Sequence, residues 1–141
     1  MEDDTQNSKT TGEDKRQHLI FIQDVITRMA SNSFLIKGWS VAGIGALYVF
    51  WIDTQNLWKL WLILVINTLF WIHDSYYLKL ERDYRALYDS VRNTKESEID
   101  YSMKASSTCS MLEAAARPIL IGSYGILTVV TVILICINRG A

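Results

Sequence analysis

Three hydroxyl side chains share one face of an otherwise apolar stretch near the end of the chain. Tyr124, Thr128 and Thr131 are spaced at i, i+4 and i+7, which places them on one side of an α-helix. A mildly polar stripe on an apolar helix can line an aqueous path through a membrane. The alternative is that the threonines bond the carbonyls of their own helix and the stripe packs on a neighbouring helix. Both interpretations stay open at this point.

One charge, Lys37, lies inside an earlier apolar stretch, with Ser40 about one helical turn further on. The long lysine side chain can reach back to the membrane surface. If several copies of the chain formed a ring, these lysines at its cytoplasmic mouth would favour anions. The sequence therefore predicts an anion-leaning pore with the following lining residues: Lys37, Ser40, Tyr124, Thr128 and Thr131.

His73 and Asp74 stand together where another hydrophobic stretch ends. They are candidates for a proton-linked or gating pair, because ionisable residues at membrane depth mark functional sites. The alternative is a polar step at the membrane interface with locally satisfied hydrogen bonds. The sequence has no phosphate-binding loop, metal-ligand spacing or nucleophile–base set. We therefore expect no catalytic residue, no metal site, no cofactor and no enzymatic activity.

Cations and tyrosines alternate in the region that follows. The candidate ligand-binding residues there are Lys79, Arg82, Tyr84, Arg85, Tyr88 and Arg92. Positive charge together with aromatic rings suits a phosphate-bearing ligand whose base can stack. Acidic residues are almost as frequent in this region, so a solvated, salt-bridged helix face is the alternative.

An all-α membrane protein is the fold class that must position these residues. The chain has 141 residues, is 50% hydrophobic and carries a net charge of −1. Its length supplies material for one domain, and its charge gives no bulk attraction to nucleic acid. Three stretches are apolar and long enough to cross a bilayer, residues 34–52, 57–73 and 117–138. Pro118 suits the first turn of the third helix.

The other segments complete the predicted layout. We expect a disordered acidic tail over residues 1–14 and an amphipathic helix over residues 15–33 that ends at a break near Ser33. Residues 74–116 are predicted as a cytoplasmic helical hairpin whose second helix covers residues 101–116. Small residues in the first span, among them Ala42 and Ala46, serve either packing within the chain or self-association.

Lysine and arginine are unevenly distributed along the chain. Five precede or begin the first span, seven lie between the second and third spans, and the other two are Lys59 and Arg139. The positive-inside rule then puts the N-terminus and residues 79–117 in the cytoplasm and the C-terminus outside. We expect a multi-pass protein of the bacterial inner membrane.

Two blocks of the sequence, QDVITRMASNSFLIKGW and FWIHDSYYLKLERDYRALYD, resemble a family of small uncharacterised bacterial membrane proteins with several helices. The resemblance covers much of residues 17–92. Size and layout are also similar to the membrane effectors of nucleotide-signalling antiphage defence systems, of which the Hailong channel effector is one example. This second similarity is one of architecture. It implies a channel gated at its cytoplasmic helices by a nucleotide or oligonucleotide that a partner nucleotidyltransferase makes.

Two functions follow from these observations. The first is a homo-oligomeric, gated ion channel that acts in antiphage defence by depolarising the cell. Because three helices cannot enclose a water-filled path, the channel requires a ring of copies, for which a tetramer is one candidate. The alternative is a non-conducting membrane adaptor that recruits a cytoplasmic protein partner through residues 74–116.

Overall fold

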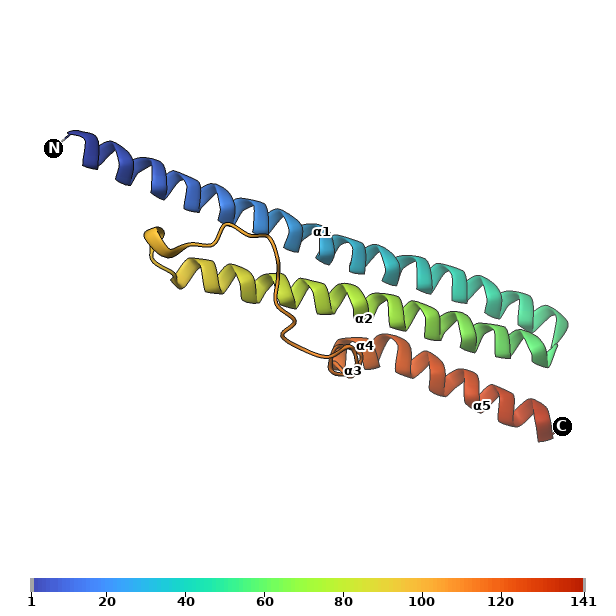
Figure 1. Ribbon diagram of the computed structural model, residues 1–141. Coiled ribbons are helices and arrows are strands. Elements are labelled where there is room, and N and C mark those ends of the chain that lie inside the picture. The colour runs from blue at the N-terminus through green and yellow to red at the C-terminus, as the bar shows by residue number, and fades with distance from the viewer. Residues whose placement is uncertain (1, 141) are drawn as a thin grey trace.

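Two long antiparallel helices form the body of the molecule, as the computed structural model in Figure 1 shows. The structure describes the backbone of residues 2–140 and the side chains of residues 12–139. Helix α1 spans Glu2–Thr54 and α2 spans Leu57–Asn93. Only Gln55 and Asn56 join them. Gln55 has a positive φ of 51°, a left-handed conformation that reverses the chain within two residues.

A third rod lies along the half of α2 that is next to this turn (Figure 1). It consists of α4 (Pro118–Leu120), a π-helical turn η2 (Ile121–Gly125) and α5 (Ile126–Gly140). Within the described residues, three helices are long and apolar enough to cross a membrane, namely Gly12–Thr54, Leu57–Asn93 and Pro118–Arg139. For the described residues, the predictions of an all-helical fold and of three helices able to span a membrane are therefore confirmed.

The first span does not begin at a break. Helix α1 continues without interruption through Ser31, Asn32 and Ser33, so the predicted division between residues 15–33 and 34–52 is wrong. This triplet contains neither glycine nor proline, and the Ser33 hydroxyl binds Asp74 of α2 instead of capping its own helix.

The helix also covers residues 2–14, where the sequence predicts a disordered acidic tail. No proline or glycine pair interrupts this part of the chain, so the backbone can extend α1 toward its start. Met1 and the side chains of residues 2–11 lie outside the described residues.

The predicted helical hairpin over residues 74–116 is wrong in its second half. Helix α2 leaves the apolar region and continues as one rod to Asn93, which agrees with the first helix of the hairpin. Beyond a short 3₁₀ turn (η1, Glu96–Glu98), residues 99–110 form no helix, and only α3 (Met111–Ala115) follows. We call residues 99–110 the strap, because they return along the two long helices toward the third rod (Figure 1).

Serine side chains explain why the strap is not helical. The N–H of Lys104 donates to Ser102 Oγ at 3.3 Å, and the Ser107 hydroxyl donates to the carbonyl of Cys109 at 3.4 Å. Such local bonds offer the backbone partners that compete with helical hydrogen bonds. Helical structure resumes only at α3, where Ser110 and Glu113 form a capping box.

Two apolar clusters hold the helices together at opposite ends of the molecule. Near the turn, all three rods contribute to the first cluster, which contains Ile44, Trp51, Leu60, Ile63 and Ile135. The second cluster joins the N-terminal part of α1 to the C-terminal part of α2 and contains Ile22, Ile26 and Val91. We call this two-helix part, residues 12–32 and 75–93, the arm. Between the two clusters the helix interface is polar.

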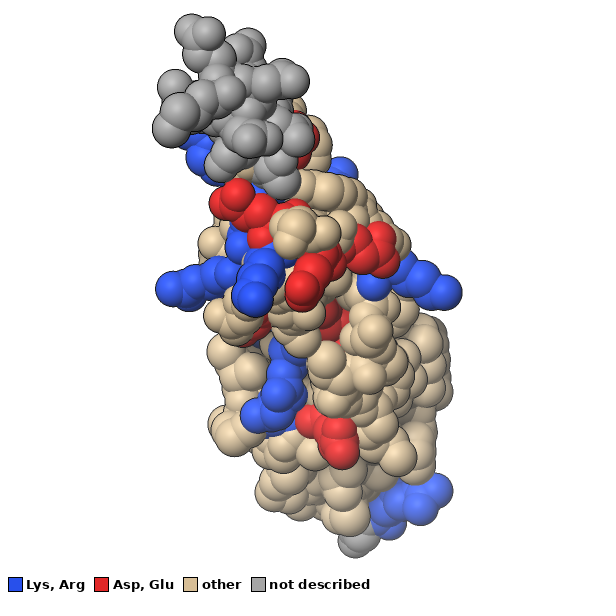
Figure 2. All heavy atoms as spheres, turned by 60° about the vertical axis from the view of Figure 1, so that its left-hand side comes forward, with Lys and Arg blue, Asp and Glu red and all other residues tan. Residues whose placement is uncertain are grey.

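The outer surface changes along the molecule. Charged side chains gather over the arm, whereas much of the remaining face in Figure 2 is uncharged. Large apolar side chains on the spans are exposed, including Phe34 at 77% and Trp39 at 70%, as expected of helices that face lipid. At the end with the turn, the Arg139 guanidinium lies 5.6 Å from the ring of Trp61.

Candidate functional site

A buried carboxylate, Asp74 of α2, is the centre of the polar interface. The Ser33 hydroxyl of α1 donates a hydrogen bond to its Oδ1. The Lys37 ammonium of α1 lies 2.6 Å from its Oδ2. The Tyr124 hydroxyl of the third rod donates to the same oxygen at 3.1 Å. These four residues join all three rods, and we call them the clasp.

The antiparallel register of the long helices brings the clasp together. Lys37 precedes Gln55 by as many residues as Asp74 follows Asn56, so the two charges lie at the same level. Ser33 is one helical turn before Lys37 on the same face, and Lys37 Nζ donates to Ser33 Oγ at 2.7 Å. Tyr124 belongs to the π-helical turn η2, a type of turn that is frequent at functional sites.

Polar side chains continue from the clasp toward the turn. The Asn67 amide donates to the carbonyl of Tyr124 at 3.1 Å and to Thr128 Oγ1 at 2.9 Å. Further along, the hydroxyl oxygens of Tyr48 and Thr131 are 2.6 Å apart. We call the following residues the seam: Ser40, Tyr48, Asn67, Thr128 and Thr131. The clasp and the seam form one polar column between the three rods.

The ion pair of the clasp is costly to bury. The Asp74 side chain is 0% exposed and that of Lys37 is 26% exposed, so both charges lose most of their water. Apolar residues of similar volume often hold such an interface as well or better, whereas removal of one partner costs about 3–5 kcal/mol. The pair is therefore a poor choice for stability alone. Ionisable residues within membrane-spanning helices are functional-site candidates for this reason.

The five predicted pore-lining residues do come together, but inside the chain. Ser40, Tyr124 and Thr131 are buried, and Lys37 and Thr128 are partly buried between the three rods. The threonine hydroxyls also donate to carbonyls four residues earlier, at 2.9 Å for Thr128 and 2.7 Å for Thr131. This arrangement has the packing that the alternative interpretation describes, and a role in a pore stays a prediction.

Asp74 changes the electrostatics that the sequence indicated. The anion preference rested on an uncompensated Lys37, but Asp74 compensates its charge in this arrangement. The two predicted gating residues also differ in their surroundings. Asp74 is in the clasp, whereas His73 is exposed and stacks on Tyr77 with ring centroids 5.6 Å apart.

The six predicted ligand-binding residues do not form one site. Arg85 pairs with Glu81 at 2.6 Å, and Lys79 pairs with Asp83 at 2.8 Å. The other four members are dispersed over the arm. Tyr84 and Tyr88 pack against its apolar cluster. Arg82 is partly buried, and its Nη1 atom has no hydrogen-bond partner among the described residues, whereas Arg92 is exposed. Two of the six, Arg85 and Tyr88, share a cavity of about 280 Å³. Asp89 lines the same cavity, so the cavity wall carries a negative as well as a positive charge.

Asp83 ties the strap to the arm. The backbone N–H and the hydroxyl of Thr108 each donate to Asp83 Oδ1 at 2.7 Å. Burial acts to raise the pKa of Asp83, but the hydrogen bonds from Lys79 and Thr108 outweigh it and hold the pKa below its ordinary value of 3.8. The hydrogen bond to Asp83 likewise raises the pKa of Lys79.

Ser33 and Tyr48 belong to the clasp and the seam, although neither was predicted from the sequence as a site residue. Their signal was the helical spacing itself, because Ser33, Lys37 and Ser40 repeat at intervals of four and three residues and Tyr48 continues the same face. Ser33 was instead assigned to a break between helices.

Among the side chains of residues 12–139, no group of three or more His, Cys, Asp or Glu residues is placed to hold a metal ion. Comparison with protein-family models, with curated proteins and with solved structures finds no match to this chain. The geometry of the clasp and the seam is therefore the basis for a functional proposal.

Proposed function

We propose that this protein is a gated membrane channel assembled from several copies, and that the clasp holds its closed state. The observation that carries the proposal is the Lys37–Asp74 ion pair, buried between the spans with the seam behind it. Separation of the third rod from α1 and α2 would break the bond from Tyr124 to Asp74. It would also uncover the hydroxyl and amide groups of the seam, which can line an aqueous path.

Assembly of several copies supplies the wall that a single chain lacks. The outward face of α1 carries Gly38, Ala42, Gly45 and Ala46, all exposed. A Cβ atom built on either glycine would meet nothing within 4 Å. Because small residues let helices approach closely in lipid, this face suits contact between copies better than packing within the chain.

The setting of the channel belongs to the same proposal. The distribution of lysine and arginine favours the bacterial inner membrane with the arm in the cytoplasm and the C-terminus outside. The architectural resemblance adds a role in antiphage defence, in which opening depolarises the cell. Control by a nucleotide at the arm has weaker support, because carboxylates neutralise Lys79 and Arg85.

A membrane adaptor is the second candidate, and the strap favours it. Tyr101 and Met103 of the strap are exposed and line an open cavity of about 370 Å³ together with Phe21 of α1. An exposed aromatic surface on a long arm suits a protein partner. Co-purification of a stoichiometric protein with a monomeric membrane part would favour the adaptor over the channel.

Current recording in planar bilayers tests the channel. We expect the unaltered protein to be mostly closed and Asp74→Asn to raise the current, because Lys37 loses its charged partner. The exchanged pair Lys37→Asp/Asp74→Lys should return the current toward the unaltered level. Asp89→Asn, a change at an exposed carboxylate of the arm, serves as the matched control. Absence of current from every variant would contradict the channel.

A further inference from the structure

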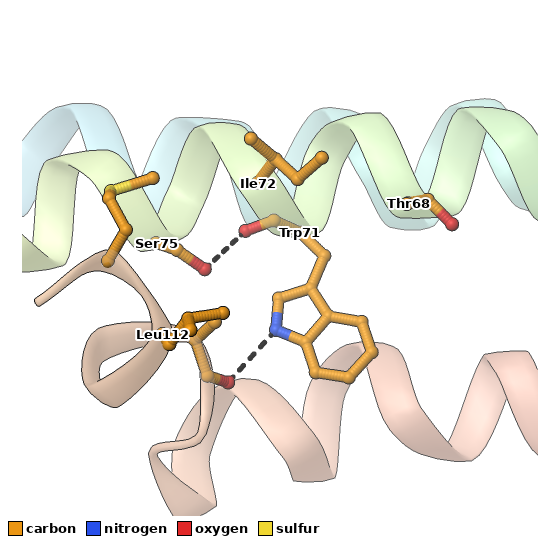
Figure 3. Close-up of a pocket in the computed structure, with 7 residues that line it drawn as sticks. Thr68, Trp71, Ile72, Ser75 and Leu112 are labelled. Carbon is orange, nitrogen blue, oxygen red and sulfur yellow. Dashed lines mark hydrogen bonds between the residues drawn. The ribbon is translucent and has the colours of Figure 1, made fainter.

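An apolar groove lies beside the clasp, between α2 and α3 (Figure 3). It is a cavity of about 210 Å³, and its walls are formed by Thr68, Trp71, Ile72 and Ser75 of α2 and by Met111, Leu112 and Ala115 of α3. We propose that this groove binds one acyl chain of a membrane phospholipid.

The polar atoms of the groove are already used within the chain. The Thr68 hydroxyl donates to the carbonyl of Leu64 at 2.8 Å, and the Ser75 hydroxyl donates to the carbonyl of Trp71 at 2.6 Å. The indole N–H of Trp71 donates to the carbonyl of Ala115 at 3.1 Å, as Figure 3 shows. With these donors satisfied, the groove offers an occupant only van der Waals contact and apolar surface, which suits a hydrocarbon chain.

The location of the groove selects a lipid among apolar ligands. Thr68, Trp71 and Ile72 belong to the second span, so the groove opens at membrane depth, where acyl chains are the surrounding medium. Helix α3 has the character of an interfacial helix. Leu112 is 82% exposed, whereas Ser110 and Glu113 at its start form a polar cap.

A cation stands where the headgroup of such a lipid would lie. Arg117 follows Ala115 of the groove wall by two residues and directly precedes the third span, so it is placed at the membrane interface. Its side chain is exposed, and among the side chains of residues 12–139 no carboxylate forms an ion pair with it. A guanidinium can bind a phosphate through two parallel hydrogen bonds. A phospholipid satisfies both the groove and this charge.

Trp71 connects the groove to the clasp. The Trp71 ring stacks on Tyr124 with centroids 6.4 Å apart and planes 16° from parallel. Tyr124 in turn donates to Asp74. An acyl chain in the groove would support Trp71 in this position and so favour the closed clasp. This coupling rests on the proposed channel function, whereas lipid binding itself does not.

Fluorescence quenching of Trp71 tests the binding. In a chain whose other four tryptophans are changed to phenylalanine, Trp71 is the single reporter. The chain is kept in detergent micelles, to which phosphatidylcholine with brominated acyl chains is added in increasing fractions. We expect the quenching to saturate at a low fraction of brominated lipid in the micelle, as for a lipid that the groove retains in preference to detergent. Ala115→Leu, which fills the groove, should weaken the apparent affinity by about tenfold, the penalty of an overpacked site.

Ala116→Leu is the matched control, because it adds the same volume at the neighbouring exposed residue outside the groove. It should leave the quenching curve of Trp71 unchanged. A second reporter chain that keeps only the exposed Trp39 checks folding, since its quenching should be the same with and without Ala115→Leu.

The proposal is overturned if quenching of Trp71 rises in proportion to the brominated fraction and Ala115→Leu has no more effect than Ala116→Leu. In that case the groove meets only the lipid that is mixed into the micelle around the protein. Because the readout is fluorescence, a protein that binds lipid here and never conducts current would refute the channel function while leaving the lipid site in place.

Discussion

The Asp74 carboxylate forms polar contacts with three side chains, and each of these side chains has a different effect. Lys37 compensates its charge, Tyr124 connects it to the third rod, and Ser33 occupies the oxygen that the other two leave free. A buried carboxylate that loses its counter-charge is strongly unfavourable. The energetics of the site should therefore depend on the pair as a unit.

This dependence gives a prediction about stability. Asp74→Ala should lower the free energy of unfolding by about 3–5 kcal/mol, because it leaves Lys37 partly buried without a partner. The double variant Lys37→Met/Asp74→Leu should recover most of that loss, since neither charge then remains. Steric trapping in detergent micelles can measure both values. A double variant as unstable as the single one would contradict this account of the pair.

Single residues also mark the limit of what the sequence predicts. Lys37 and Asp74 were each noticed as ionisable residues at membrane depth, because polar residues are rare there. Their pairing depends on the register of α1 and α2, which the two-residue turn at Gln55–Asn56 sets. With a loop of another length, the same residues would lie at different levels of the membrane.

At the scale of elements, the apolar segments were predictable, whereas the polar ones were predictable only in part. The three spans follow from long uncharged stretches and from Pro118 at the start of the third, which act locally. Most of the strap was predicted to belong to a helix over residues 101–116, a stretch that lacks proline and glycine. Its actual path depends on Asp83 of α2, a contact that is distant in the sequence.

The anchor of the strap gives a second prediction. Asp83→Ala should increase the amide exchange of Thr108, corrected for its intrinsic rate, by about tenfold near pH 7, since a hydrogen bond to a charged acceptor is lost. Asp89→Ala, at an exposed carboxylate of the same helix, should leave this exchange unchanged. Equal amide exchange of Thr108 in the two variants would contradict the conclusion that Asp83 holds the strap.

The pKa of Asp83 sets the pH dependence of the same contact. The folded pKa lies below the ordinary value of 3.8, so the contribution to stability is complete above that value and is lost as the pH falls through the lower folded pKa. We therefore expect the strap to stay anchored at neutral and mildly acidic pH and to detach in strong acid. Exchange of Thr108 measured across a pH series, with Asp83→Ala as the reference, checks this sign.

At the scale of the whole molecule, the polar column lies between the three rods, whereas the face of α1 with small residues lies on the outer surface. The column is internal, whereas Ala42 and Ala46 are on the outside of α1. Copies can therefore associate through α1 while each keeps its own clasp closed. The two long helices, the third rod and the arm would then act as one gating unit within a larger assembly.

The mass of the detergent-solubilised particle, measured by light scattering with correction for bound detergent, tests this assembly. We predict a discrete oligomer of about four or more copies, as a ring with a central path requires. Ala42→Leu/Ala46→Leu should reduce the mass by preventing close approach of helices, whereas Val132→Leu, at an exposed residue of α5, should not. A monomer or dimer in the unaltered protein would leave no room for a central pore.

In the proposed channel the clasp seals the seam from water, and thiol accessibility tests this seal most directly. In a chain with Cys109 and Cys136 changed to serine and alanine, Thr131→Cys places one thiol in the seam. A water-soluble thiol reagent should react slowly with it while the clasp is intact, and at least about tenfold faster when Asp74→Asn is added, since the thiolate forms only where water enters. Equal reaction rates with and without Asp74→Asn would contradict the claim that the clasp closes an aqueous path.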